Sequence, residues 1–120
     1  PQWIEASRRI MGWLGDRTRR LPQALPHALL ALQRIHEPPA RLVLAGAWPG
    51  QELEALRAAA GEGYRPDVVL TRADPHHPSG FVRSLARSGD KAVAYFCEGG
   101  TCRAPVARPE ELILELNRTN

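Results

Sequence analysis

The proline pair Pro38-Pro39 divides the sequence into two parts whose apolar residues follow different spacings. Before the pair, apolar residues recur at roughly every third or fourth position, which is typical of amphipathic helices. After the pair, short continuous apolar runs alternate with segments of helical spacing, and such runs are typical of buried strands. The runs span residues 41–46, 66–73 and 91–98. The change of spacing predicts a helical pair over residues 1–37 and a small α/β domain over residues 38–120.

The N-terminal part is predicted to contain two helices with a polar loop between them. Residues 3–14 form the first helix, and residues 21–37 form the second, in which Pro26 suits the first turn. Residues 15–20, with the sequence GDRTRR, are expected to be a helix-breaking loop. The two helices either cover one face of the sheet or are the end of a larger helical domain.

The C-terminal part is predicted to contain a mainly parallel sheet, because strands that alternate with helices form parallel sheets through crossover connections. The three apolar runs are expected to be parallel to one another. Residues 101–107 follow a tight turn and are expected to run antiparallel at an edge, since Pro105 has no N–H group for a sheet ladder. The expected fold class is α/β: three parallel strands plus an antiparallel edge strand, flanked by helices and preceded by a helical pair.

Charge and composition argue against two classes of partner, nucleic acids and membranes. The net charge is +3, Lys91 is the only lysine, and arginines are scattered, with the densest run at residues 17–20. Nucleic-acid binders concentrate their cations on one face, so we expect a solvated surface and no nucleic-acid partner. No apolar run approaches the ~20 residues that span a bilayer, and we expect no membrane partner. Two cysteines are too few for a disulfide framework, which favours a cytoplasmic location.

The stretch AYFCEGGTCRAPV contains both cysteines, Cys97 and Cys102, on either side of a glycine pair. If the glycines form a two-residue hairpin turn, Glu98 pairs with Thr101 and the two cysteines face each other. Their Cα atoms would then be about 4.5 Å apart, as in a non-hydrogen-bonded pair. Alternation places one strand's Val93, Tyr95 and Cys97 on the same face as the next strand's Cys102, Ala104 and Val106.

Three roles for this thiol pair stay open. Packing or a purely structural bridge is the favoured interpretation, because cysteine behaves as a small apolar residue in a sheet. The second is a redox role, in which Cys97 and Cys102 cycle between dithiol and disulfide. The third, zinc binding, is disfavoured because two thiolates are half of a structural zinc site.

Two further segments contain residue types found in ligand sites. Asp74, His76 and His77 carry divalent-metal ligands in one loop, yet the flanking prolines suit a plain turn, so a metal is not favoured. Residues 42–56 are predicted as strand, glycine loop and helix, but they lack the dinucleotide and phosphate-loop fingerprints. Trp48 in this loop is interpreted as a packing residue that could cap a groove beside the first strand. No cofactor is expected.

Several motifs in residues 21–116 resemble one known family. They are LPQALPHALLAL, PPARLVLAGAW, YRPDVVL and KAVAYFCEGGTCRAPVARPEELILEL. Together they resemble the C-terminal region of the thioredoxin-domain-containing spermatogenesis-associated protein 20 family. The sequence departs from the family pattern at Ala47-Trp48, where the family tends to have an acidic residue after the glycine.

The resemblance implies a larger parent protein with an N-terminal thioredoxin-like domain, an (α/α)6 barrel similar to N-acylglucosamine 2-epimerases, and a C-terminal α/β tail. Residues 1–37 would be the last helices of the barrel, which places this segment among six-hairpin glycosidase-like folds, and the tail would begin near Arg41. No catalytic residue is carried over, so we expect a non-catalytic accessory domain. Its partner would be the barrel of its own parent chain, with self-association when isolated. The alternative is a redox module that uses Cys97 and Cys102.

Overall fold

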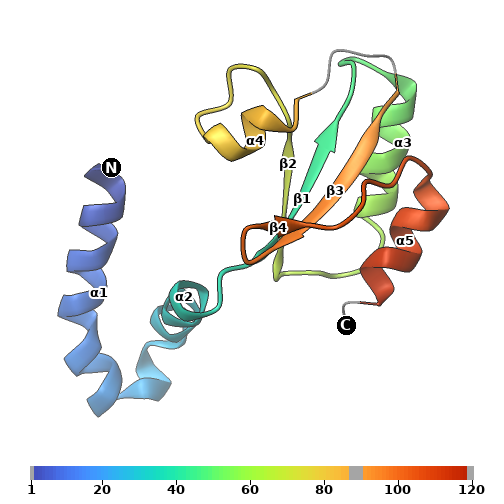
Figure 1. Cartoon of the computed structure of the whole chain (residues 1–120). Helices are drawn as coiled ribbons and strands as arrows, with labels where there is room; N and C mark the ends of the chain where they lie inside the picture. Colours follow the sequence, from blue (N-terminus) through green and yellow to red (C-terminus); the bar gives the residue numbers. More distant parts are fainter. Residues whose placement is uncertain (1, 87–90, 119–120) are drawn as a thin grey trace. The chain divides into compact units, whose positions relative to one another are not determined.

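The computed structural model describes residues 2–86 and 91–118 of the chain (Figure 1). The chain divides into two compact units, Pro1–Pro38 and Pro39–Asn120. Across the described residues, no helix combines the length and apolar character that crossing a bilayer requires.

The first unit is helical. It contains α1 (Gln2–Arg20), a short 3-10 helix (Pro22–Ala24) and α2 (Pro26–His36), with Pro26 at the first position of α2. The predicted loop at residues 15–20 is wrong, because α1 continues through this segment. Side chains one turn apart stabilise it: Arg19 pairs with Asp16 at 3.2 Å, and the Arg17 guanidinium stacks on the Trp13 ring at 3.8 Å.

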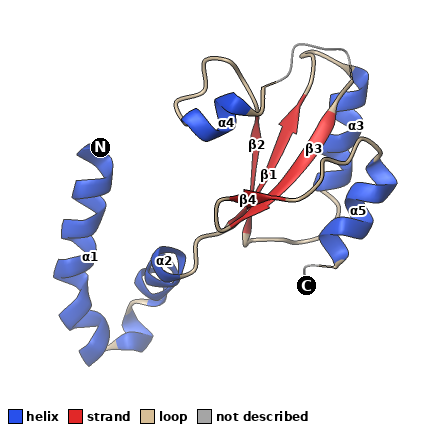
Figure 2. Ribbon diagram, viewed as in Figure 1, coloured by secondary structure: helices blue, strands red, loops and turns tan. Residues whose placement is uncertain are grey.

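The second unit is a four-stranded sheet with helices on both faces (Figure 2). Its strands lie in the order β2-β1-β3-β4. The elements along the chain are β1 (Ala40–Ala45), α3 (Gln51–Ala60), β2 (Val68–Arg72), α4 (Gly80–Ser84), β3 (Val93–Glu98), β4 (Thr101–Cys102) and α5 (Pro109–Asn117). The fold class is therefore mixed α/β, as the sequence predicts.

The direction of β3 differs from the prediction. β1 and β2 are parallel, but β3 pairs antiparallel with β1, so the sheet has one parallel pair and not three parallel strands. The reason lies in α4, which has five residues. At a rise of about 1.5 Å per residue, such a helix cannot return the chain along the length of a strand. The chain therefore re-enters the sheet at the end where β2 left it, and β3 runs back.

Two apolar clusters cover the two faces of the sheet. On one face, α3 and α5 pack side by side, and their Leu53, Leu56, Leu112 and Leu116 contact the inward side chains of β1 and β3. On the other face the short α4 contributes Val82, with Phe81 and Leu85 beside it. The same cluster contains Cys97, so the predicted thiol pair lies on the α4 face.

β2 is less covered than its apolar sequence predicts. Val69 and Leu70 are exposed although they point to opposite faces, and Thr71 is half-buried. The prediction of a buried strand is wrong here because β2 lies at the edge of the sheet, while α3 and α5 pack over its centre. Only Val68, at the start of β2, packs against the α3–α5 cluster.

Candidate functional site

The hairpin between β3 and β4 has the register that the sequence predicts. Glu98 pairs with Thr101, and Cys97 pairs with Cys102. Gly99 and Gly100 both have positive φ angles, +55° and +87°, which is the backbone of a type I′ turn and favours glycine at both positions. The turn therefore fixes the two cysteines opposite each other.

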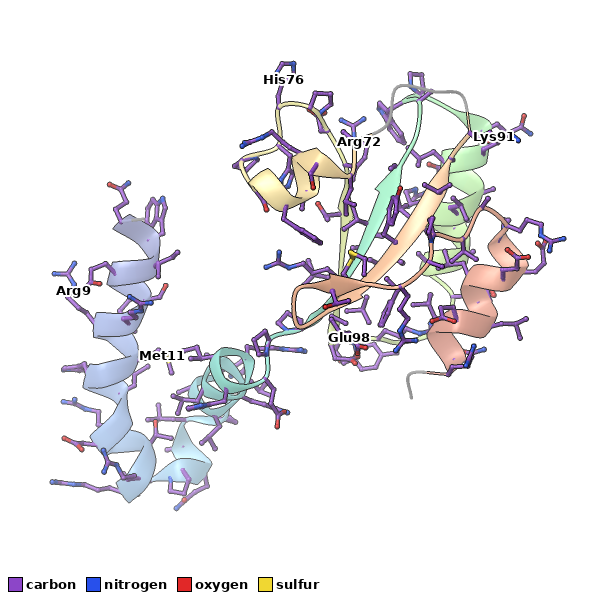
Figure 3. All side chains as sticks on the ribbon, viewed as in Figure 1. Arg9, Met11, Arg72, His76, Lys91 and Glu98 are labelled. Atoms are coloured by element: carbon purple, nitrogen blue, oxygen red, sulfur yellow. A yellow bond between two sulfur atoms is a disulfide. The ribbon has the colours of Figure 1, made fainter. Side chains whose placement is uncertain are left out.

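The two cysteines form a disulfide, which appears as a yellow bond between sulfur atoms (Figure 3). Their Cα atoms lie 3.9 Å apart, closer than the expected 4.5 Å of an unbridged pair. Cys97 is buried and Cys102 is half-buried, and Tyr95 and Val82 belong to the same apolar cluster. The disulfide thus joins Cys97, which lies inside the core, to Cys102, which lies nearer to the surface.

The strand that follows the hairpin is shorter than predicted and changes face. After Cys102 the regular ladder stops, and a single antiparallel bridge joins Val106 to Ala94. The pairing of Val106 with Ala94 is offset by one residue from the register of the hairpin, so one extra residue lies between Cys102 and Val106. Consequently Val106 packs with the α3–α5 cluster while Cys102 packs with the α4 cluster. The predicted common face for Cys102 and Val106 is wrong.

Arg103 connects the hairpin to α5. Its guanidinium binds Glu98 at 3.0 Å and Glu115 of α5 at 2.5 Å, and it lies 4.9 Å from the centre of the Phe96 ring. The hydrogen bond that Arg103 donates to the Glu115 carboxylate is the main cause that raises the pKa of Arg103. The charge of Arg103 is thus used for structure beside the disulfide.

The loop with Asp74, His76 and His77 is closed by its own hydrogen bonds. Asp74 accepts the backbone N–H of His76 at 2.7 Å and pairs with Arg72 at 2.9 Å, while His77 Nδ1 accepts the Ser79 N–H at 3.1 Å. The His76 hydrogen bond is the main cause that keeps the pKa of Asp74 below its ordinary value. Among residues 2–86 and 91–118, no three metal-binding side chains gather closely enough to hold an ion. The expectation that a metal is not favoured at these three residues stays an untested prediction.

A pocket lies beside the first βα turn, where the sequence indicated only that Trp48 could cap a groove. It has a volume of about 420 Å³ and is lined by Leu44, Trp48, Leu53, Arg57, Leu70, Thr71 and Arg72. Arg72 at the end of β2 stacks over the Trp48 ring at 5.4 Å. Figure 3 shows Arg72 and His76 at the end of this unit opposite Glu98. A tryptophan in a strand-to-helix loop was the one sequence signal for this pocket, and its partner Arg72 in β2 was not indicated.

The helical unit has a different feature, a large exposed apolar surface. Trp3 and Trp13 of α1 are 77% and 62% exposed. Further exposed apolar side chains of the two helices are Ile4, Ile10, Leu29, Leu30 and Ile35. Thr18 is the one buried residue among the described residues of this unit. Soluble monomers rarely leave such a surface without a partner.

Comparisons with known proteins agree with the resemblance seen in the sequence. The chain is 30% identical over 116 residues to human spermatogenesis-associated protein 20 and 28% identical to the rat and mouse proteins. Each match covers 92% of this chain but 15% of the relative, so the chain spans about one seventh of the length of these relatives. No protein-family model matches the chain, and no solved structure matches it. The chain is therefore homologous to a segment of spermatogenesis-associated protein 20, which is consistent with the predicted match to the C-terminal region.

Proposed function

We propose that the chain is a non-catalytic C-terminal accessory domain of a longer protein, and that α1 and α2 dock it on the rest of that protein. In this proposal residues 1–37 are the last helices of an (α/α)6 barrel, and residues 38–120 are the appended α/β domain. A thioredoxin-like domain would precede the barrel. The direct task of the chain is to bury an apolar face of the barrel.

The observation that carries the proposal is the exposed apolar surface of α1. Trp3, Ile10 and Trp13 lie at helical spacing and are all exposed. Burial of each such side chain would contribute about 1.5–3 kcal/mol, so their exposure in isolation is costly. A partner with a complementary apolar face removes that cost. The homology supports the same conclusion, since the relatives extend far beyond the matched segment.

The proposal is tested with the chain alone, by light scattering after size-exclusion chromatography at increasing concentration. We expect the chain to self-associate, because the face meant for the barrel is free. The double variant Trp3→Ser/Trp13→Ser should remain monomeric. Leu114→Ser is the matched control, since Leu114 is an exposed apolar side chain on α5 of the other unit, and it should not change the association.

Hydrogen exchange supplies the second arm of this test. Amides of α1 and α2 should exchange quickly in the isolated chain and slowly in a longer protein that includes the preceding barrel. A monomeric chain whose α1 amides are already protected would contradict the proposal, because the helices would then need no partner.

The disulfide favours a second candidate function, a thiol–disulfide module. A dithiol reductant would donate two electrons and two protons, the Cys97–Cys102 bond would break into two thiols, and the reductant would leave as a disulfide. Half-buried Cys102 offers the sulfur nearer to solvent.

Alkylation of the native chain with and without a dithiol, followed by mass spectrometry, tests this candidate. Two labelled cysteines in a chain that keeps its near-UV circular dichroism would support exchange. Labelling only after unfolding would assign the bridge a structural role. The docking proposal does not depend on the result.

A further inference from the structure

We propose that the pocket beside the first βα turn binds a small organic acid that carries a carboxylate on an aromatic or apolar body. The pocket lies on residues of β1, β2, α3 and the loop that contains Trp48. The pocket contains no residue of the helical unit. This proposal therefore goes beyond the docking role and is tested independently of it.

The packing of α3 creates the pocket. α3 pairs with α5 over β1 and β3, so the same face of β2 is left open after Val68. Leu70 points to this face, since it pairs with Leu42 of β1, and it is 44% exposed. Leu44 and Leu53 form the buried floor, and Trp48, 57% exposed, forms a wall. A flat apolar body would cover Leu70 and the indole face together.

The charge of the lining specifies an anion. Arg57 and Arg72 are the charged residues among those that line the pocket, and no carboxylate lines it. Each guanidinium group is held by a carboxylate that does not line the pocket, Arg57 by Glu54 and Arg72 by Asp74 at 2.9 Å. Each guanidinium has five N–H donors, and these bonds use only part of them. The remaining donors suit a carboxylate, which binds guanidinium with charge-assisted geometry.

The position in the fold agrees with a ligand site. Open α/β sheets bind ligands in the crevice beyond the carboxyl ends of their parallel strands, where Leu44 and Arg72 lie. The volume of about 420 Å³ falls in the range of small-molecule pockets. The start of α3 is not the anion site, because Glu52 already accepts the Ala92 N–H there at 3.1 Å. The anion is instead expected at the two arginines.

The test titrates the whole chain with 1-naphthylacetate and with its neutral analogue 1-naphthylacetamide. Binding is followed by the indole N–H resonance of Trp48, which Trp48→Phe identifies among the three tryptophans. The acid should shift this resonance and bind at least about tenfold more tightly than the amide, as one charge-assisted pair provides. Acetyl-Ala-Phe carries the same group on a peptide. If acetyl-Ala-Phe binds more weakly than 1-naphthylacetate, the ligand is a free small molecule. If acetyl-Ala-Phe binds more tightly, the proposed small-molecule ligand is overturned in favour of the C-terminus of a polypeptide.

Variants separate the pocket from general attraction to a basic protein. Arg72→Gln should lower the affinity for 1-naphthylacetate about tenfold, to that of the amide. Arg57→Gln is a second variant that leaves the Asp74 loop intact and should weaken binding in the same direction. Arg118→Gln is the control, since Arg118 is also exposed and paired with a carboxylate but lies outside the pocket, and it should have no effect. Equal binding of acid and amide, or equal loss in all three variants, would overturn the proposal.

Discussion

The two units of the chain distribute their apolar residues in opposite ways. The unit of residues 39–120 gathers many of its large side chains in two apolar clusters, and Leu42, Leu56 and Phe96 are almost fully buried. In the helical unit, Trp3, Trp13 and other large apolar side chains stay exposed. The comparison teaches that the sheet unit completes its own core, whereas the helical unit has the surface of an element that needs a partner.

The largest expected effect contrasts one leucine in each unit. Leu56→Ala removes a fully buried side chain of α3, and we expect it to lower the free energy of unfolding by about 2–5 kcal/mol. Leu30→Ala removes an exposed side chain of α2, and its effect should stay within about 0.5 kcal/mol in the isolated chain. Urea unfolding measures both. Equal losses would break the comparison, since Leu30 would then belong to a core as well.

Loss of the disulfide is expected to lower the free energy of unfolding by a smaller amount. The disulfide lies in the sheet unit, so its loss tests the stability of that unit alone. Replacement of both Cys97 and Cys102 by alanine should cost about 2 kcal/mol, the chain-entropy value for so short a loop. Urea unfolding of the wild-type chain with reductant should give a similar loss. A double variant as stable as the oxidised chain would show that packing alone holds the hairpin.

The smallest effect concerns pH and the loop at Asp74. Because the pKa of Asp74 is lowered in the folded chain, this carboxylate stabilises the loop above its ordinary pKa. The contribution is lost as the pH falls through the lowered value and the carboxylate takes up a proton. A carboxyl NMR titration should give a midpoint for Asp74 below that of an unfolded peptide. The control, Asp74→Asn, should remove the acid-dependent shift of the His76 amide; a shift that persists would contradict the assignment.

Local sequence patterns predicted most elements of the sheet unit. The β strands, the glycine hairpin and the pairing of Cys97 with Cys102 follow from spacing and turn chemistry, which are properties of neighbouring residues. The direction of β3 did not follow, because it depends on whether α4 is long enough to return the chain. The one-residue offset before Val106 was also missed. It becomes visible only when this segment is paired with β3, and the segment's own sequence does not reveal it.

The pocket could be predicted only in part. A tryptophan after a strand suggested a groove, but Arg72 lies more than twenty residues further along the chain and reaches Trp48 through the pairing of β1 with β2. The exposure of Leu70 depends on where α3 sits over the sheet. Both facts come from packing between elements, and a single sequence does not encode them in its local spacing.

Because of the extra residue between Cys102 and Val106, this short segment contributes side chains to both faces of the sheet. On its way to α5 the chain crosses from the α4 side of the sheet to the α3–α5 side, so the five residues from Cys102 to Val106 join the two hydrophobic layers. A single-residue deletion there would turn Val106 toward the wrong layer and pull Arg103 away from Glu115. The length of this crossing, more than the identity of its residues, therefore decides which layer Val106 joins.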